Sequence, residues 1–204
     1  MDLREVFKQR RSVNFFDAKR KVSEEEVKKI YAMASLCPSS FNLQPWKILL
    51  ISNPEEKKKL RQAALNQPKV EEASVIVVLL ADIKGYEEIN KVFDDMVEKG
   101  YQKEEARDTY AGLAKSLYGN DISARGFALR NAGLFAMSFI LAAKYLGIDT
   151  HPMDGFEQDK VKEAFNIPDR YEVAMLIAVG YHDKEKPLLT RLRRKNFDEV
   201  VIKM

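Results

Sequence analysis

The sequence predicts an α+β fold in which a few strands are surrounded by helices. The run at 73–81 is continuously apolar and rich in β-branched residues, as in a strand buried on both faces. The segment 123–145 is a long helix that is apolar on more than one side, so other elements must cover it on several sides. The predicted strands do not alternate regularly with helices, which argues against a doubly wound parallel sheet.

Capping and proline signals define the elements in the first third of the chain. Ser23 and Glu26 form a capping box, which begins a helix that continues to Leu36. Pro38 ends this helix, because the residue before a proline avoids the helical conformation. Pro54, at a first helical position, begins the next helix. A short helix at 2–9 and a strand at 46–52 complete this part of the chain.

The later elements follow from periodicity and from the positions of glycines. The charged segment 85–118 is expected to form two helices that separate near Gly100, and the long helix is expected to end at Gly147. The apolar run 172–180 is expected to be a third strand. The tail 197–204 could be a further strand, but it has no hairpin partner nearby, so it would pair at a distance or with another subunit.

Composition indicates a single globular domain that extends over residues 1–204. The net charge of +3 gives no bulk electrostatic case for binding nucleic acid. The single cysteine, Cys37, cannot form an internal disulfide, and no signal peptide is visible, so we expect a cytoplasmic protein with an inert, at least half-buried thiol. The longest apolar stretch, 132–143, is too short to span a bilayer, so we expect no membrane association.

Five irregular segments concentrate polar residues at the ends of apolar elements, where binding residues are often placed. They are 10–14, 38–46, 66–69, 147–156 and 191–195. In the first, Arg10 and Arg11 carry planar donors that suit phosphate oxygens or the carbonyl edge of a flat ring, although a solvated basic turn is an alternative. The run that contains Arg191, Arg193 and Arg194 suits a phosphate too, with the same alternative.

Two further segments offer neutral groups and a lysine. Ser39, Ser40 and Asn42 alternate with apolar residues in a proline-bounded loop, which suits an uncharged heterocycle or, alternatively, a plain capping loop. Asn66 and Lys69 could face one pocket or lie on a surface turn. The glycine patterns of dinucleotide-binding folds, P-loops and serine hydrolases do not occur in the chain.

The segment 147–156 follows the long helix. Within it, Gly155 permits either a close backbone approach or an unusual dihedral angle. His151 and Asp154 invite a metal or acid–base interpretation, but His182 is the only other histidine and no carboxylates lie at ligand spacing. We therefore expect no metal site.

Taken in order, these segments resemble the nitroreductase family of FMN-dependent NAD(P)H oxidoreductases. The matching pieces, which extend over nearly the whole chain, are RRSVNFF at 10–16, PSSFNLQPW at 38–46, GIDTHPMDGF at 147–156, LIAVGY at 176–181 and RLRRKNFDEVV at 191–201. The resemblance implies an α/β/α sandwich with a mainly antiparallel sheet. It also implies an intertwined homodimer with two FMN sites at the interface, each lined by both chains.

The resemblance further implies roles for individual residues. The FMN phosphate and ribityl chain would be contacted by Arg10, Arg11 and Ser12, together with Arg191 and either Arg193 or Arg194. Pro38, Ser39, Ser40 and Asn42 would come from the second chain and line the flavin ring. Asn66 and Lys69 would approach its pyrimidine edge, and the backbone at Met153, Asp154 and Gly155 would lie near flavin N5.

Asn14 departs from the family pattern, because many relatives carry Lys or Arg at this position. A cation there stabilises negative charge at the N1–O2 edge of reduced flavin. With Asn14 a dipole replaces the charge, so Lys69 would carry more of this work.

The implied activity is hydride transfer from NADH or NADPH, through flavin N5, to a flat electron-poor small molecule such as a nitroaromatic or a quinone. No side chain is required as a catalyst, because the cofactor supplies the chemistry. One alternative is other flavin chemistry on the same fold, such as dehalogenation, ene-type reduction or flavin breakdown. The others are a flavin-binding protein without turnover and a nucleic-acid or anion-binding module.

Overall fold

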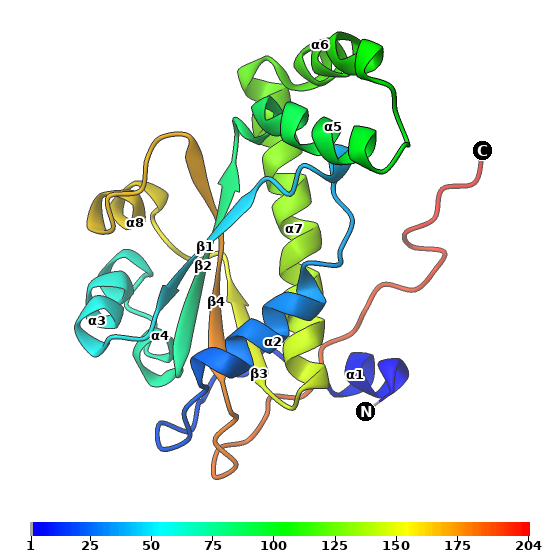
Figure 1. The fold of residues 1–204 in the computed structure, drawn as a ribbon. Helices are drawn as coiled ribbons and strands as arrows, with labels where there is room; N and C mark the ends of the chain where they lie inside the picture. Colours follow the sequence, from blue (N-terminus) through cyan, green and yellow to red (C-terminus); the bar gives the residue numbers. More distant parts are fainter. Residues whose placement is uncertain (1) are drawn as a thin grey trace.

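A four-stranded antiparallel sheet forms the centre of the computed structural model, which describes residues 2–204 (Figure 1). The strand order is β1-β2-β4-β3. The strands are β1 (Trp46–Ile51), β2 (Val75–Asp82), β3 (Asp149–Met153) and β4 (Tyr171–Gly180). All three pairings are antiparallel, which confirms the predicted sheet type.

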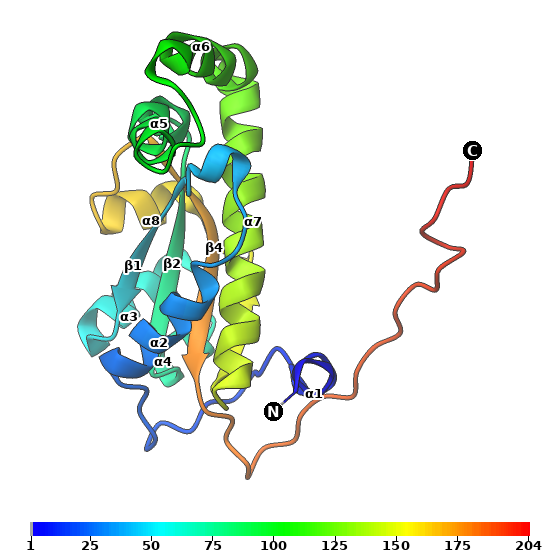
Figure 2. The same cartoon turned by 45° about the vertical axis from the view of Figure 1, so that its right-hand side comes forward.

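Helices cover both faces of the sheet, as predicted for an α/β/α sandwich. α2 and α7 lie on one face, and α3, α4 and α8 lie on the other (Figures 1 and 2). The helices are α1 (Leu3–Gln9), α2 (Glu24–Ala34), α3 (Pro54–Ala63), α4 (Lys69–Glu72), α5 (Ile89–Glu98), α6 (Arg107–Tyr118), α7 (Asp121–Tyr145) and α8 (Gln158–Ala164). Short 3₁₀ turns are η1 (Ser40–Asn42), η2 (Gly85–Glu88) and η3 (Glu104–Ala106).

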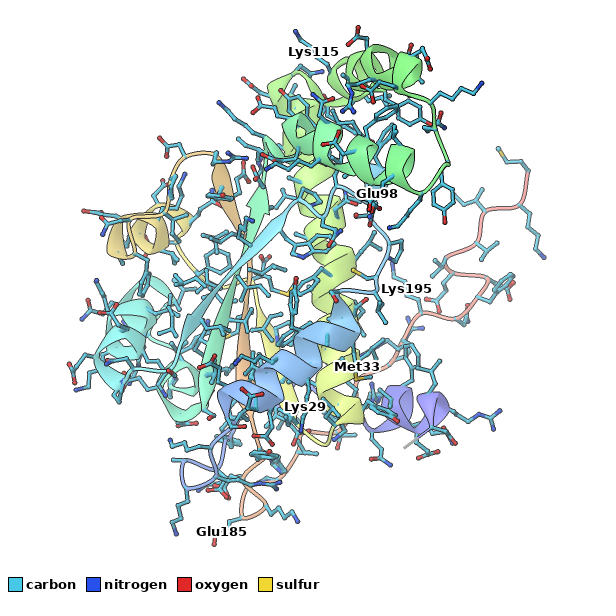
Figure 3. The ribbon with its side chains drawn as sticks, viewed as in Figure 1. Lys29, Met33, Glu98, Lys115, Glu185 and Lys195 are labelled. Atoms are coloured by element: carbon cyan, nitrogen blue, oxygen red, sulfur yellow. The ribbon has the colours of Figure 1, made fainter. Side chains whose placement is uncertain are left out.

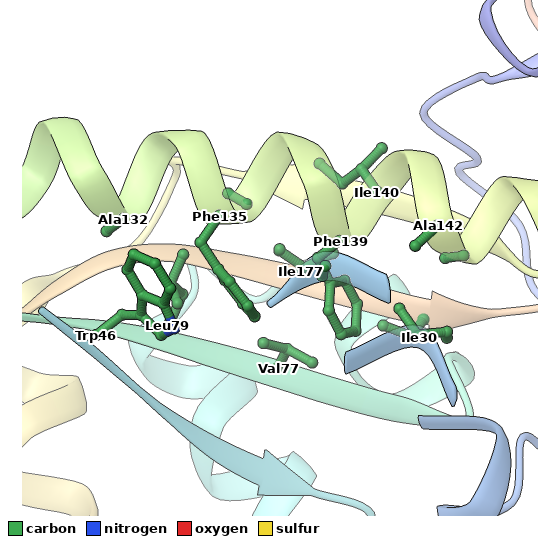
Figure 4. Packing of buried hydrophobic residues seen from close by; sticks show 14 of the residues in the cluster. Ile30, Trp46, Val77, Leu79, Ala132, Phe135, Phe139, Ile140, Ala142 and Ile177 are labelled. Carbon is green, nitrogen blue, oxygen red and sulfur yellow. The ribbon is translucent and has the colours of Figure 1, made fainter. Parts of the chain in front are cut away.

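The sandwich has two cores, one on each face of the sheet, and side chains fill the space between the layers (Figure 3). Every residue of β2 is buried, and alternate residues of this strand belong to opposite cores. This two-residue period is the geometry that a strand imposes. On the α7 side, Phe135 and Phe139 point from the helix toward Val77 and Ile177 of the sheet (Figure 4). The Trp46 ring stacks on Phe135 at a centroid distance of 4.9 Å.

The local signals in the sequence define the ends of several elements. The capping box of Ser23 and Glu26 is present at the start of α2, although this helix ends at Ala34. Gly100 and Gly147 have φ angles of 72° and 79°, which favour glycine, and they follow α5 and α7. The predicted break near 100 and the predicted end of the long helix are therefore confirmed.

One expectation about the strands is wrong, and for the tail, pairing with another subunit stays a prediction. The segment expected to be irregular contains β3, which pairs with β4 and carries Pro152. A proline is tolerated there because β3 lies at the edge of the sheet. The tail 197–204 forms no strand within the described chain, and the views show it extending away from the sandwich. It lies beside no sheet edge of its own chain and therefore finds no pairing partner there.

The helix α7 begins two residues before the expected 123–145 and ends where expected. By length and composition alone, it is long and apolar enough to cross a membrane. However, 56% of its most apolar window is buried inside the structure. Phe127, Phe135 and Phe139 are fully buried, as expected for the core helix of a sandwich.

Candidate functional site

Arginine side chains from both ends of the chain meet at the end of α1. Arg10 follows the last residue of this helix. The Nη2 atom of Arg191 donates to the carbonyl oxygens of Arg10 and Lys8, at 2.9 and 3.0 Å. Arg11 in turn donates to the carbonyl oxygen of Leu189. The tail is therefore held against α1 through backbone oxygens, which leaves the positive charges of the guanidinium groups without acidic partners.

These arginines form a cluster of like charge. Within residues 2–204, Arg10, Arg11, Arg191 and Arg194 make no ion pair with a carboxylate. The pKa of Arg10 is lowered, first by burial and then by the charges of Arg191, Arg194 and Arg11. Because arginine stays protonated in proteins, this repulsion remains unless an anion binds. The arrangement therefore favours a phosphate or another compact anion, whose oxygens guanidinium groups bind in pairs.

Arg193 differs from its neighbours. It forms a two-pronged ion pair with Glu199, with N–O distances of 2.7 and 2.9 Å. Sequence reasoning left Arg193 and Arg194 as equal candidates for the phosphate. The structure directs Arg193 to an acid within the tail and leaves Arg194 near Arg10.

A second group of polar side chains lies where the 10–14 segment meets β3. The backbone of Ser12 forms an isolated parallel β-bridge with that of Thr150. The amide N–H of Val13 donates to the carbonyl oxygen of Thr150 at 3.1 Å. His151 Nδ1 lies 2.9 Å from the carbonyl oxygen of Val13, and its Nε2 lies 3.4 Å from Lys69 Nζ. Three of the predicted segments are thus joined within one chain.

Gln67 connects this group to the turn after β3. Its Nε2 donates to the carbonyl oxygen of Gly155 at 2.9 Å, and its Oε1 lies 3.4 Å from Lys69 Nζ. A Cβ atom on Gly155 would lie 3.3 Å from Gln67 Nε2 and 3.4 Å from Leu65. A glycine at 155 therefore allows the side chains of Gln67 and Leu65 to lie close to the backbone. The alternative, an unusual dihedral angle, does not apply, because the φ angle of Gly155 is not positive. The Met153 side chain belongs to the core, which leaves only its backbone for a ligand, whereas Asp154 is exposed.

Lys69 and His151 both have pKa values below those of ordinary surface residues. Burial lowers the pKa of Lys69. Burial and the Lys69 charge both lower the pKa of His151, which keeps its ring neutral near pH 7. Within residues 2–204, no three His, Cys, Asp or Glu side chains gather in a way that could hold a metal ion.

Backbone strain concentrates in two of the predicted segments. Six non-glycine residues of the described chain have positive φ angles. Five of them lie in or beside these segments: Phe41, Asn42, Gln44, Leu65 and Asn66. Such conformations cost free energy and cluster at ligand sites, where surrounding contacts hold them. The strain singles out the 38–46 loop and the turn before Lys69 independently of their sequence motifs.

The 38–46 loop is held by α7. The backbone N–H of Ser40 donates to Oδ1 of Asn131 at 2.9 Å, and Asn131 Nδ2 donates to the carbonyl oxygen of Phe127 at 2.7 Å. Asn131 is buried, and sequence reasoning missed it. The signal was a lone amide in a helix that is apolar on all sides. On the outer side of the loop, Phe41 packs edge-on against Tyr118.

The described chain does not bring all the predicted residues together. Residues 10–14, 66–69 and 151–155 adjoin one another, whereas the 38–46 loop contacts α5 and α7. Within residues 2–204, no hydrogen bond or ion pair joins that loop to the other segments. Pro38 and Asn42 are exposed, Ser39, Ser40 and Asn14 are half-buried, and Ser12 and Asn66 are exposed. A single chain therefore holds the predicted site residues in two separate groups.

Comparisons with known proteins identify the family of the chain. The Nitroreductase family model matches residues 7–181. MhqN of Bacillus subtilis, named as an NAD(P)H nitroreductase, is 35% identical over 197 residues, which cover 95% of this chain and 94% of that protein. A crystal structure of an Exiguobacterium sibiricum nitroreductase in complex with FMN has a TM-score of 0.85 at 33% identity and covers 98% of this chain and 96% of that one. The CLA biosynthesis enone reductase of Lactiplantibacillus plantarum is 31% identical over 199 residues, which cover 95% of this chain and 92% of that protein.

Proposed function

Since this chain belongs to the nitroreductase family, we propose that it is an FMN-dependent NAD(P)H oxidoreductase that works as a homodimer. The arginine cluster is the observation that carries the proposal. Within residues 2–204, four guanidinium groups without acidic partners gather at one end of the 10–14 segment, and Val13 of that segment contacts the half-buried group that contains Lys69 and His151. A phosphate joined to a flat polar ring matches the charge of the first part and the donors of the second.

Each part of the site has a proposed role toward the cofactor. Arg10, Arg191 and Arg194 would hold the phosphate, with Arg11 and Ser12 beside them. Lys69 and Asn66 would face the pyrimidine edge of the ring, and the N–H groups of the 153–155 turn would orient its N5. The chemistry that FMN supplies when bound is hydride transfer at N5, from NADH or NADPH to an acceptor. The chain contributes position and a positive field at the edge where negative charge develops.

A second subunit would supply the remaining part of the site. Apolar side chains stay exposed in a single chain on three elements, α1, α7 and the tail: Leu3, Phe7, Leu134, Met137, Tyr145, Leu189, Leu192 and Phe197. Exposed apolar side chains of this size favour association with a partner that covers them. In a dimer, the 38–46 loop of one subunit would complete the site that the arginines of the other begin. A reducing compartment such as the cytoplasm suits Cys37, whose thiol has a pKa raised by burial.

The proposed acceptor is a flat electron-poor molecule, a nitroaromatic or a quinone. Ene-type reduction is a second candidate, because the alignment with the relative named as an enone reductase covers 95% of this chain. Both acceptor classes receive hydride from the same reduced flavin, so the fold alone does not separate them.

The visible spectrum of the purified protein tests the cofactor assignment. We expect a flavin spectrum that NADH or NADPH bleaches under argon and that an acceptor restores. Nitroaromatics, quinones and enones compared under identical conditions rank the acceptor classes. A colourless protein that gains no flavin spectrum on incubation with FMN would contradict the proposal, and a yellow protein that neither nicotinamide bleaches would indicate flavin binding without turnover.

Mixed dimers test whether two chains share each site. One chain carries Arg10→Ala and the other carries Ser40→Ala with Asn42→Ala, each with a different affinity tag. If each site takes its arginines from one subunit and its loop from the other, the mixed dimer retains one intact site and both homodimers retain none. FMN content per tag-purified dimer is the measurement. Mixed dimers that bind no more FMN than the two homodimers would contradict a shared site.

A further inference from the structure

We propose that His151 is a positioning residue that fixes the ammonium group of Lys69 within the ring-facing part of the site. This inference rests on the proposed function, because it assigns the Lys69 charge to the flavin ring. Lys69 begins α4 and His151 lies on β3, so contact between their side chains ties two elements of the site together. Both side chains are half-buried, and Lys69 Nζ lies 3.4 Å from His151 Nε2.

The hydrogen bonds of His151 decide which of its nitrogens carries the proton. Nδ1 lies 2.9 Å from the carbonyl oxygen of Val13, which can only accept, so Nδ1 must carry a hydrogen. In the neutral ring, Nε2 then presents a lone pair toward Lys69 and accepts from its ammonium group. A doubly protonated ring would set two cations against each other. Burial and the Lys69 charge lower the pKa of His151 and so favour the neutral ring.

The surroundings of Lys69 leave its charge available. Within residues 2–204, Lys69 makes no ion pair, and its other side-chain hydrogen bond is to Gln67 Oε1 at 3.4 Å. The Glu72 carboxylate acts on Lys69 only from beyond ion-pair distance. Two neutral acceptors therefore set the position of the ammonium group without cancelling its field. A carboxylate in their place would cancel much of that field. Since Asn14 is uncharged, Lys69 is the one permanent cation among the ring-facing side chains Asn14, Asn66, Gln67, Lys69 and His151.

A purely structural role for His151 makes a different prediction. In that case, only the hydrogen bond from Nδ1 to Val13 matters, because it attaches the 10–14 segment to β3. Two substitutions separate the roles by the reach of their side chains. His151→Asn keeps a donor near the Nδ1 position and loses the acceptor for Lys69. His151→Gln keeps an acceptor near the Nε2 position and loses the donor to Val13.

The test uses the FMN-loaded enzyme and measures the cofactor without turnover. The readouts are the midpoint potential of bound FMN and its affinity for sulfite, which adds to oxidised flavin and places negative charge on the N1–O2 edge. We expect His151→Asn to lower the potential and to weaken sulfite binding on the order of tenfold, which corresponds to one charge-assisted hydrogen bond. His151→Gln should stay close to the unsubstituted enzyme in both readouts.

A double-mutant cycle connects the effect to Lys69. Lys69→Met alone should lower the potential further than His151→Asn does, and adding His151→Asn to it should change nothing more. His182→Gln, at the half-buried second histidine outside the site, is the matched control and should leave both readouts unchanged.

Several outcomes would overturn the inference. One is His151→Asn matching the unsubstituted enzyme while His151→Gln shifts both readouts, which is the structural pattern. Another is an undiminished effect of His151→Asn in the Lys69→Met background. If His151→Asn does not retain FMN, the variants His151→Gln and Lys69→Met decide the question. A potential of His151→Gln as low as that of Lys69→Met would contradict the positioning role, because His151→Gln keeps the acceptor for Lys69. An unsubstituted protein that binds no FMN would contradict the proposed function instead.

Discussion

The sandwich and the C-terminal tail bury their apolar residues to opposite extents. Every residue of β2 is buried, and Phe135 and Phe139 of α7 are fully enclosed between helix and sheet. In contrast, every residue from 184 to 204 is exposed, and the tail includes Leu192, Phe197 and Ile202. The sandwich is stabilised within its own chain, whereas the apolar side chains of the tail stay exposed there. This exposure supports the proposed dimer, in which the tail would pack against the second chain.

The comparison extends to the site. The contacts from Val13 through His151 and Lys69 to Gln67 belong to the sandwich and are complete in one chain. Arg191 and Arg194 belong to the tail, which lies beside α1 because Arg191 donates to the carbonyl oxygens of Lys8 and Arg10 and because Arg11 donates to that of Leu189. The ring-facing residues should therefore tolerate loss of the tail, whereas the phosphate-facing cluster should not.

Removing the tail is the change with the largest expected effect. A chain that ends at Lys186 loses two guanidinium groups of the cluster and the exposed apolar residues of the tail. We expect a monomer whose affinity for FMN falls on the order of 100-fold or more, because each charge-assisted hydrogen bond contributes about 1.5–3 kcal/mol. Analytical ultracentrifugation and flavin titration check both results. A truncated chain that remains a flavin-binding dimer would show that the tail is dispensable.

A cavity in the sandwich should affect folding instead. Phe139 is fully buried between α7 and the sheet, so Phe139→Ala should lower the free energy of unfolding by about 3–5 kcal/mol. The matched change in the tail, Phe197→Ala, should leave folding of the isolated subunit unchanged and weaken only the dimer. Urea unfolding at several protein concentrations separates the two effects. Equal losses of stability at low concentration would remove the distinction between the two regions.

The arginine cluster offers a prediction of intermediate size. Arg10→Ala should weaken FMN binding by about 1.5–3 kcal/mol, because it removes charge-assisted hydrogen bonds to the phosphate. Arg193→Ala is the control within the tail, since Arg193 is occupied by Glu199 and should change FMN affinity little. Flavin fluorescence titration measures both. An equal loss for the two variants would indicate a general effect of positive charge and not a defined phosphate site.

The smallest expected effect is a pH dependence of stability. His151 has a pKa below its ordinary value of 6.5 in the folded chain, because it is buried beside Lys69. The unfolded chain therefore binds more protons than the folded chain as the pH falls below 6.5, and the free energy of unfolding decreases there. Above 6.5 this contribution is constant. His151→Gln should flatten the decrease between pH 6.5 and 5 in urea unfolding, and an unchanged slope would contradict the shift.

Much of this protein was determined by the sequence alone. The alternating burial of β2, the capping box at Ser23 and the glycines after α5 and α7 are local features, so each could be recognised without knowing its neighbours. The family resemblance extended this to the sandwich and the family, whereas the FMN site and its named residues stay predictions. The burial pattern, the capping box and the glycines are short-range signals, because each lies within a few residues of the element that it defines.

Tertiary structure alone decided the rest. β3 is a strand because it pairs with β4. Its proline and polar residues are untypical of a strand, so the sequence did not predict it. Arg193 and Arg194 are adjacent in sequence, and only the structure shows that Arg193 pairs with Glu199. Asn131 and the Lys69–His151 contact join residues far apart along the chain. Such contacts depend on which elements pack together. The packing of the whole core decides this, and no local sequence pattern contains it.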